Sequence, residues 1–249
     1  MKLNLRADHI ARGTNILDVE VPEALRARHL SELVFWDDAL GGQGFTPSAV
    51  TLFCGTPGSG KTTMMLELAN SLTRTGAAVL FNTAEESLFQ LKMTVERLRL
   101  RSGFVAGQET NVPKLLEYCD EIRAANPGKP FFLIVDSLQT LDDGKFKSGR
   151  ITTATSERAL LLITDYCKEH FCNAVIIGQV TKDGKMAGSQ KLKHMVDAFI
   201  SLDVERKDKD LVGCRILMTE KNRFGGAGHM FYLTLRDRGF TEVARVSVG

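Results

Sequence analysis

Apolar residues in this chain fall into short continuous runs that alternate with stretches of helical periodicity. The runs are typical of buried strands and cover residues 50–54, 79–81, 131–135 and 174–177. Apolar residues recur at helical spacing in residues 64–72, 88–100, 112–125 and 155–170. Strands that alternate with helices predict an α/β fold in three layers, with a largely parallel sheet between two layers of helices.

The pattern changes after residue 199, where strand-like runs follow one another without helices between them. These runs are residues 200–204, 214–219 and 230–235, which we interpret as an antiparallel extension at the sheet edge. Ahead of the first strand, residues 23–30 have a short helical pattern, and residues 37–48 are rich in turn-forming residues. We therefore expect one domain with a short N-terminal extension.

The strongest chemical signal lies between the first strand and the first long helix. Residues 55–63 read GTPGSGKTT, a phosphate-binding loop with the strand and helix that this motif requires. Backbone N–H groups and the positive end of the helix dipole would stabilise a polyphosphate there. We expect Lys61 to reach the β and γ phosphates and the Thr62 hydroxyl to bind Mg²⁺. The predicted nucleotide-binding residues are Gly55, Thr56, Pro57, Gly58, Ser59, Gly60, Lys61, Thr62, Thr63 and Asp136.

Three polar residues that follow predicted strands complete the candidate catalytic site. Asp136 can hold Mg²⁺ together with Thr62, although a strand-end aspartate can also simply cap a turn. Glu85 is the first choice to orient the attacking water, with Glu86 as its neighbour; the alternative is that acids in a first helical turn are favoured by the dipole. Gln179 either senses the γ-phosphate through its amide or closes the sheet as an ordinary polar residue.

Composition narrows the class of protein. The chain of 249 residues is 43% hydrophobic with a net charge of +2, so overall charge does not favour nucleic acid binding. Its five cysteines include no CxxC pair, which supports neither a zinc site nor a disulfide framework and suits a reducing cytoplasm. No apolar run approaches the roughly 20 residues of a membrane-spanning helix. We expect a cytoplasmic protein with no zinc and no membrane partner.

The order of motifs along the chain resembles the ATPase core of the bacterial RadA/Sms family, within the RecA/DnaB group of P-loop motors. The motifs are GTPGSGKTT, AEES, LIVDSLQT, GQVTKDGKMAG, KHMVD and KNRFG, and the resemblance spans residues 35–240. It implies a RecA-like three-layer αβα sandwich for residues 35–249, and it leaves residues 1–34 as an extension and a candidate subunit-docking segment. It also implies a homo-oligomer, in that family a hexameric ring, that hydrolyses ATP with Mg²⁺ and moves on single-stranded DNA.

The resemblance also assigns roles to individual residues. It makes Glu85 the catalytic carboxylate and agrees with the roles given above to the phosphate loop and Asp136. Lys221 and Arg223 fall on KNRFG, and in related ring ATPases a lysine and an arginine at this spacing reach the neighbouring subunit's nucleotide site. Residues two apart in a strand point to the same face, which fits this role. A solvated basic strand end is the alternative.

Two polar segments with several lysines follow the predicted strands that end near Asp136 and Gln179. In RecA-type motors the corresponding loops face the central channel and hold single-stranded DNA, and a ring multiplies their positive charge. The candidate DNA-binding residues are Lys145, Lys147, Arg150, Lys182, Lys185, Lys191 and Lys193. The alternative is that both segments are ordinary solvated loops.

The chain departs from the family pattern in several respects. The family's N-terminal four-cysteine zinc module and its C-terminal protease-like domain do not appear in this sequence. Ser48 stands where the family has a glycine, and Gln179 replaces its usual histidine, which brings that position closer to RecA and DnaB. We expect the two missing modules to affect regulatory and branch-migration roles more than ATP hydrolysis.

Three classes of function remain open on the sequence alone. The first is a DNA-dependent ATPase, either a helicase or translocase motor or an accessory factor in recombination and repair. The second is a KaiC-like signalling ATPase that does not bind DNA, and the third is a structural protein that uses ATP only to assemble. Stimulation of ATP turnover by DNA separates the first two. A Glu85→Gln variant with intact function would favour the third.

Overall fold

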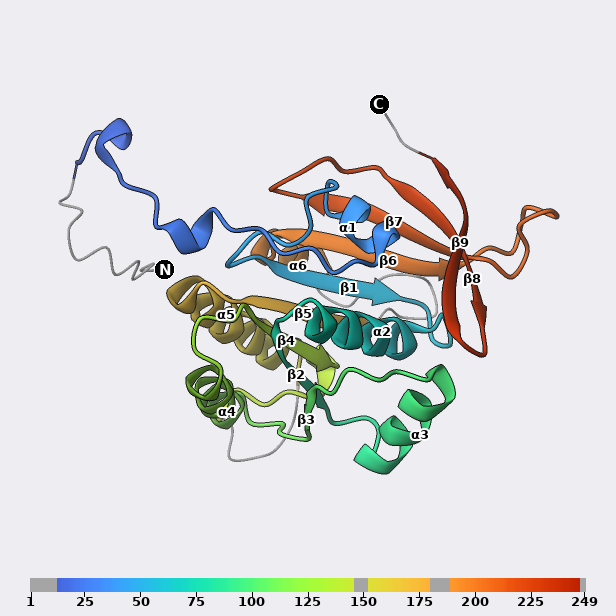
Figure 1. The fold of residues 1–249 in the computed structure, drawn as a ribbon, viewed down its shortest axis with the longest axis horizontal. Helices are drawn as coiled ribbons and strands as arrows, with labels where there is room; N and C mark the ends of the chain where they lie inside the picture. The colour runs from blue at the N-terminus through green and yellow to red at the C-terminus, as the bar shows by residue number, and fades with distance from the viewer. Residues whose placement is uncertain (1–12, 146–151, 180–188, 247–249) are drawn as a thin grey trace.

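The structure, a computed structural model, describes residues 13–145, 152–179 and 189–246, and the statements below concern these residues. They form a nine-stranded sheet in the order β3-β2-β4-β5-β1-β6-β7-β8-β9, with helices on both faces (Figure 1). The strands are β1 (Val50–Gly55), β2 (Ala78–Thr83), β3 (Val105–Gly107), β4 (Phe131–Asp136), β5 (Asn173–Gln179), β6 (Ala198–Val204), β7 (Arg215–Asn222), β8 (Met230–Arg236) and β9 (Gly239–Val246). The helices are α1 (Val34–Ala39), α2 (Lys61–Arg74), α3 (Leu88–Leu98), α4 (Val112–Ala125), α5 (Thr153–His170) and α6 (Ser189–Met195).

The central strands carry a hydrophobic core on each face of the sheet. Successive strand residues point to opposite faces, so neighbours in one strand belong to different cores. Phe53 and Phe132 pack with Trp36 of α1 and with the apolar face of α2. Leu52 and Leu133 pack on the other face with residues of α4 and α5. The predicted three-layer αβα sandwich, mostly parallel with antiparallel C-terminal strands, is confirmed.

The antiparallel part of the sheet begins one strand later than the sequence pattern predicts. β6, which contains the run 200–204, pairs with β1 in parallel, whereas β7, β8 and β9 are antiparallel. Placing 200–204 in the antiparallel extension was therefore wrong. The first five residues of β6 are buried, since both of its faces are covered. A strand buried on both faces has a continuous apolar sequence, as parallel strands usually do.

Other elements also differ from the sequence interpretation. The predicted helix at 23–30 is only a 3₁₀ turn at Glu23–Leu25, because none of that turn is buried and an isolated short helix is not stable. The region 37–48 begins inside α1 rather than as a turn. The short edge strand β3, the helix α6 and the largely exposed strand β9 were not predicted. Each lacks a long apolar run, so its position depends on neighbouring elements.

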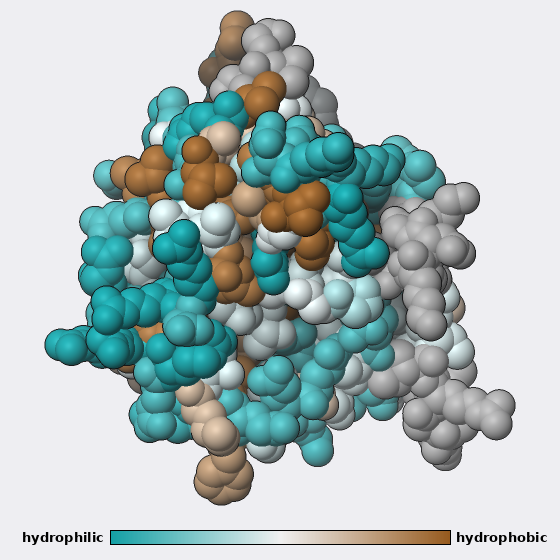
Figure 2. All heavy atoms as spheres, turned by 90° about the vertical axis from the view of Figure 1, so that its right-hand side faces the viewer, coloured by the Kyte–Doolittle hydropathy of each residue, from teal (hydrophilic) through white to brown (hydrophobic). Residues whose placement is uncertain are grey.

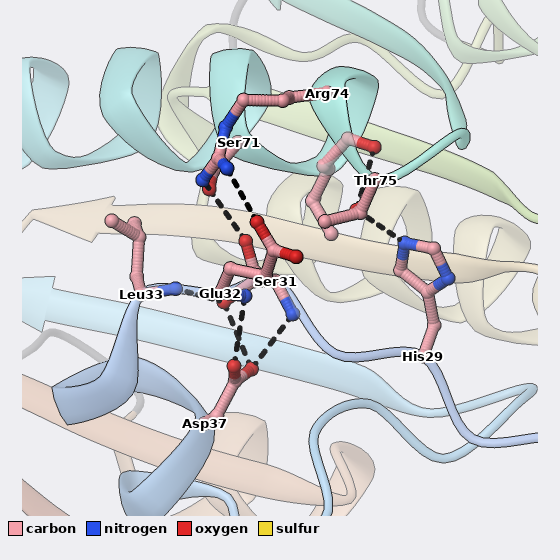
Figure 3. Close-up of polar contacts among 9 residues, drawn as sticks. His29, Ser31, Glu32, Leu33, Asp37, Ser71, Arg74 and Thr75 are labelled. Atoms are coloured by element: carbon pink, nitrogen blue, oxygen red, sulfur yellow. Dashed lines mark hydrogen bonds and ion pairs between the residues drawn. The ribbon is translucent and has the colours of Figure 1, made fainter.

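A short segment before and within α1 fastens the N-terminal part of the chain to the C-terminal end of α2 (Figure 3). The Asp37 carboxylate accepts hydrogen bonds from Ser31 N at 2.9 Å, Ser31 Oγ at 2.8 Å and Glu32 N at 2.9 Å. Ser71 Oγ donates to the Ser31 carbonyl oxygen at 2.5 Å, and Arg74 pairs with Glu32 at 2.5 Å. Burial raises the pKa of Asp37, while its hydrogen bonds act in the opposite direction. These contacts therefore fix the C-terminal end of α2, the helix that follows the phosphate loop.

Candidate active site

The candidate site lies where the central parallel strands end. Gly55, at the end of β1, is paired with Gln179 of β5, and Thr83, at the end of β2, is paired with Asp136 of β4. An open parallel sheet places its ligand crevice outside the carboxyl ends of its strands. Figure 2 views the molecule from this side, with apolar patches in the upper half and hydrophilic residues over most of the rest. Four of the predicted strands therefore bring their terminal residues to one edge.

The phosphate loop needs glycine for two different reasons. Gly58 and Gly60 have φ angles of +76° and +102°, a region that side chains disfavour. A Cβ on Gly55 would lie 2.1 Å from the Leu202 carbonyl oxygen of β6, and one on Gly60 would lie 2.9 Å from the Phe240 ring of β9. Glycine is therefore required at Gly55 and Gly60 because β6 and β9 approach the loop closely, and not only because a phosphate must approach its backbone.

Lys61 opens α2, and its side chain folds back over the loop. The ammonium donates to the carbonyl oxygens of Gly55 at 2.8 Å and Thr56 at 3.1 Å. Burial lowers the pKa of Lys61, and the nearby Asp136 carboxylate acts in the opposite direction. The lysine is held by neutral carbonyl oxygens, which phosphate oxygens can replace with a stronger charge-assisted bond.

Thr62 and Asp136, which we call the magnesium pair, lie in direct contact. Thr62 Oγ1 donates to Asp136 Oδ2 at 2.6 Å. Burial raises the pKa of Asp136 to about 6, and the Thr62 bond acts in the opposite direction. In the described residues no group of three or more His, Cys, Asp or Glu side chains could hold a metal ion. One hydroxyl and one carboxylate, completed by phosphate and water oxygens, fit Mg²⁺, which binds few protein ligands and keeps several waters.

Two neighbouring strands hold the Glu85 carboxylate. Gln179 Nε2 donates to Glu85 Oε1 at 2.7 Å, and the Ser137 hydroxyl donates to the same oxygen. The backbone N–H of Gln179 donates in turn to Gln139 Oε1 at 3.2 Å. Both carboxylate contacts go to Oε1, so among the described residues Oε2 is left without a hydrogen bond. A carboxylate fixed by one oxygen, with the other available, is suited to orient a water molecule.

Lys221 and Arg223 lie away from the phosphate loop of their own chain. The Lys221 ammonium donates to the carbonyl oxygens of Lys193, in the last turn of α6, and Val196, just after it, at 2.7 Å each. Arg223 pairs with Asp197 at 3.0 Å and donates to a carbonyl oxygen of α6 at 3.3 Å. The same Asp197 carboxylate accepts a bond from Val50 N at the start of β1. Arg223 is thus level with the amino end of the strand whose carboxyl end carries the phosphate loop.

Three candidate DNA-binding residues are described, and two of them are engaged in ion pairs. Lys191 pairs with Glu157 at 2.5 Å, and Lys193 pairs with Glu220 at 2.6 Å. Lys145 is exposed at the last described position before residue 146. These ion pairs reduce the positive charge that α6 offers to a nucleic acid. Outside the described residues lie the other four: Lys147, Arg150, Lys182 and Lys185.

Two further side chains contact the phosphate loop, although no sequence motif predicts them. Arg215 of β7 points its Nε at the Ser59 carbonyl oxygen at 3.4 Å, and the Asp203 carboxylate of β6 accepts from Thr56 N at 3.4 Å. Both contacts form only because β6 and β7 lie close to the loop. The available sequence signal is that Asp203 interrupts the apolar run of a strand otherwise buried up to that point.

No family model matches the chain. The DNA repair protein RadA of Listeria monocytogenes is 34% identical over 207 residues, and that of Brucella abortus is 32% identical over 237 residues. These alignments cover 83% and 93% of this chain and 43% and 48% of the relatives. The chain is RadA-like. It spans about half the length of the curated relatives it matches.

Three solved structures share the fold of this chain. An ATPase domain superposes with a TM-score of 0.76 at 14% identity, covering 89% of this chain and 93% of that domain. A KaiC-like protein from Pyrococcus horikoshii gives 0.70 at 19% identity, covering 88% of this chain and 99% of its own. A DnaB-like replicative helicase gives 0.71 at 15% identity, covering 81% and 59%. None of the described helices has the length and apolar character to cross a bilayer.

Proposed function

We propose that this RadA-like chain hydrolyses ATP. The observation that carries the proposal is the Glu85 carboxylate, which Ser137 and Gln179 hold at the sheet edge that bears the phosphate loop and the magnesium pair. Bound Mg²⁺ would neutralise charge on the β- and γ-phosphate oxygens. Lys61 would exchange the loop carbonyl oxygens for phosphate oxygens, and the backbone N–H groups at the start of α2 would bind the remaining ones.

In this proposal Glu85 positions the attacking water. Its Oε2 oxygen would accept a hydrogen bond from that water, while Oε1 stays bound to Ser137 and Gln179. Gln179 would then link the carboxylate to the γ-phosphate, because a shift of its amide toward a phosphate oxygen releases one of the two bonds that hold Glu85. The protein supplies position and charge, which is most of what phosphoryl transfer requires.

We propose single-stranded DNA as the partner of this ATPase, in the cytoplasm. The relatives named as DNA repair proteins support DNA over a signalling role. The fold does not separate the two, because a DnaB-like replicative helicase and a KaiC-like protein share it about equally. The basic segment that contains Lys182 and Lys185 leads directly into α6. The end of α6 is in turn held by Lys221 and Arg223. A displacement of α6 on DNA binding would therefore reach Lys221 and Arg223.

We also propose that the active form is a homo-oligomer, a ring of the kind found in related motors. Lys221 and Arg223 would complete the nucleotide site of a neighbouring copy, where a positive group stabilises transition-state charge. Residues 13–28 support a docking role for the N-terminal extension. Ile16 and Leu17 are 79% and 87% exposed, and their segment projects from the body of the molecule (Figure 1).

ATP turnover with and without single-stranded DNA tests the function. Glu85→Gln should lower turnover roughly 10²- to 10⁴-fold, the usual contribution of a positioned acid or base. Glu86→Gln is the matched control, because Glu86 adjoins Glu85 but has no hydrogen bond to Ser137 or Gln179. Equal activity of the Glu85 variant and wild type would refute the catalytic assignment. Slow turnover that DNA does not stimulate, together with no salt-sensitive DNA binding, would support the KaiC-like alternative.

A further inference from the structure

The turn between β8 and β9 packs directly on the phosphate loop. Leu235 and Phe240 are paired across this two-residue turn. A Cβ built on Gly60 would lie 2.9 Å from Leu235 Cδ2 and 2.9 Å from Phe240 Cζ. Gly60 has a φ of +102° and is the residue that precedes the first turn of α2. The two apolar side chains therefore pack against Gly60, the residue whose conformation sets the direction of the α2 N-terminus.

Glu67, in the middle of α2, holds this turn in place. Phe240 N donates to both carboxylate oxygens of Glu67, at 3.2 Å each. A Cβ on Gly239 would lie 1.9 Å from Glu67 Oε1, so the turn backbone approaches the carboxylate as closely as glycine allows. Arg97 of α3 donates to the Asp237 carbonyl oxygen of the same turn at 3.3 Å. The Glu67 carboxylate of α2, the helix that follows the phosphate loop, thus connects the β8–β9 turn to that loop.

We propose that Glu67 is a positioning residue for the triphosphate site. By holding the β8–β9 turn against Gly60, it keeps the left-handed turn of the phosphate loop in the conformation that directs the α2 N–H groups at the ligand. The inference rests on the proposed binding of ATP. No step of the chemistry uses Glu67 itself, and its carboxylate is directed at the turn rather than at the ligand crevice.

The chain offers a matched control for a purely structural role. Asn70, one turn further along α2, accepts hydrogen bonds from the backbone N–H groups of Arg101 at 3.0 Å and Ser102 at 2.9 Å. It fastens a different segment to the same helix in the same way, but that segment does not contact Gly60. If these bonds only stabilise the fold, the two residues should behave alike. If the β8–β9 turn positions the loop, only the Glu67 change should alter nucleotide affinity.

The test measures MgATP and MgADP affinity by calorimetry, and thermal stability, for wild type and for the Glu67→Ala, Glu67→Gln and Asn70→Ala variants. Glu67→Ala should raise the Kd of both nucleotides several-fold. The limit is about tenfold, reached if the whole free energy of the lost hydrogen bond serves to hold the turn against Gly60. Glu67→Gln keeps one acceptor oxygen and should stay within about threefold of wild type. Asn70→Ala should lower the melting temperature and leave Kd unchanged.

A second variant keeps the inference testable if Glu67→Ala fails to fold. Phe240→Leu shortens the side chain that contacts Gly60 and leaves the backbone bond to Glu67, so it should also raise Kd several-fold. Wild-type affinity in a folded Glu67→Ala or Phe240→Leu protein would overturn the inference while leaving the proposed function intact. Failure of the wild type to bind MgATP would overturn both. An equal loss of affinity in Asn70→Ala would reduce Glu67 to a structural role.

Discussion

Replacing Glu67 with glutamine should stabilise the protein at pH 8, and this gain should fade as the pH falls toward 4.5. Burial raises the pKa of Glu67 from 4.5 to about 7, and the Phe240 N–H bond and the charge of Arg97 only partly oppose it. A carboxyl with a higher pKa in the folded protein binds more protons there than in the unfolded chain. The free energy of unfolding therefore falls as the pH rises from 4.5 to about 7.

The magnitude follows from the two pKa values. At about 1.4 kcal/mol for each pH unit, the full interval corresponds to roughly 3 kcal/mol. Glu67 is only partly buried, so solvent reduces this and we expect about 1 to 3 kcal/mol. Glutamine has a similar shape, keeps an acceptor for Phe240 N and carries no charge. Its stability should therefore lack this component of the pH dependence.

Urea unfolding of both proteins at several pH values between 4.5 and 8.5 measures the difference. Asp136, whose pKa burial also raises, makes both proteins less stable over a similar pH range, but its contribution cancels when they are compared. The expected curve shows the glutamine variant gaining on wild type up to about pH 7 and then a constant offset. A difference that does not change with pH, or one that grows toward low pH, would refute the reasoning.

Three other changes test separate contacts. Gly239→Ala places a methyl group 1.9 Å from Glu67 Oε1 in a backbone region with φ of +106°, and should cost at least 1–3 kcal/mol in urea unfolding. Mixing Lys61→Ala with Arg223→Ala subunits should restore part of the ATP turnover that each lacks alone, and a mixture that stays inactive would contradict a shared site. Ser137→Ala removes a donor to the proposed catalytic carboxylate of Glu85 and should lower kcat about tenfold with little change in nucleotide Kd; an unchanged kcat would contradict that role.

The parallel half of the fold could be predicted because its signals are local. Buried parallel strands are continuous apolar runs, and the phosphate loop announces its own strand and helix. The same logic placed Asp136, Glu85 and Gln179 at strand ends, and the carboxyl ends of parallel strands share one edge of a sheet. The topology then brought them together without further information from the sequence.

The remaining parts depend on which elements lie side by side, and a single sequence does not carry that information. β6 has the apolar run of a buried strand, but only its pairing with β1 shows that it is parallel. Glu67 looks like an ordinary polar position on the face of an amphipathic helix. It becomes significant only when the turn at Gly239, more than 170 residues later, is placed against it. The exposed strand β9, which carries that turn, has no run long enough to predict.

The position of Lys221 and Arg223 bears directly on whether one subunit can complete its own nucleotide site. Asp197 joins Arg223 to Val50 N at the start of β1, while the phosphate loop begins at Gly55. Five residues at about 3.3 Å each separate these levels by roughly 16 Å along the strand, well beyond the reach of a guanidinium still paired with Asp197. Arg223 in the same chain therefore cannot contact the phosphates without leaving its partner and the end of α6. In a head-to-tail assembly the face that carries Arg223 can meet the carboxyl edge of the next copy, so a shared site requires no rearrangement of the sheet.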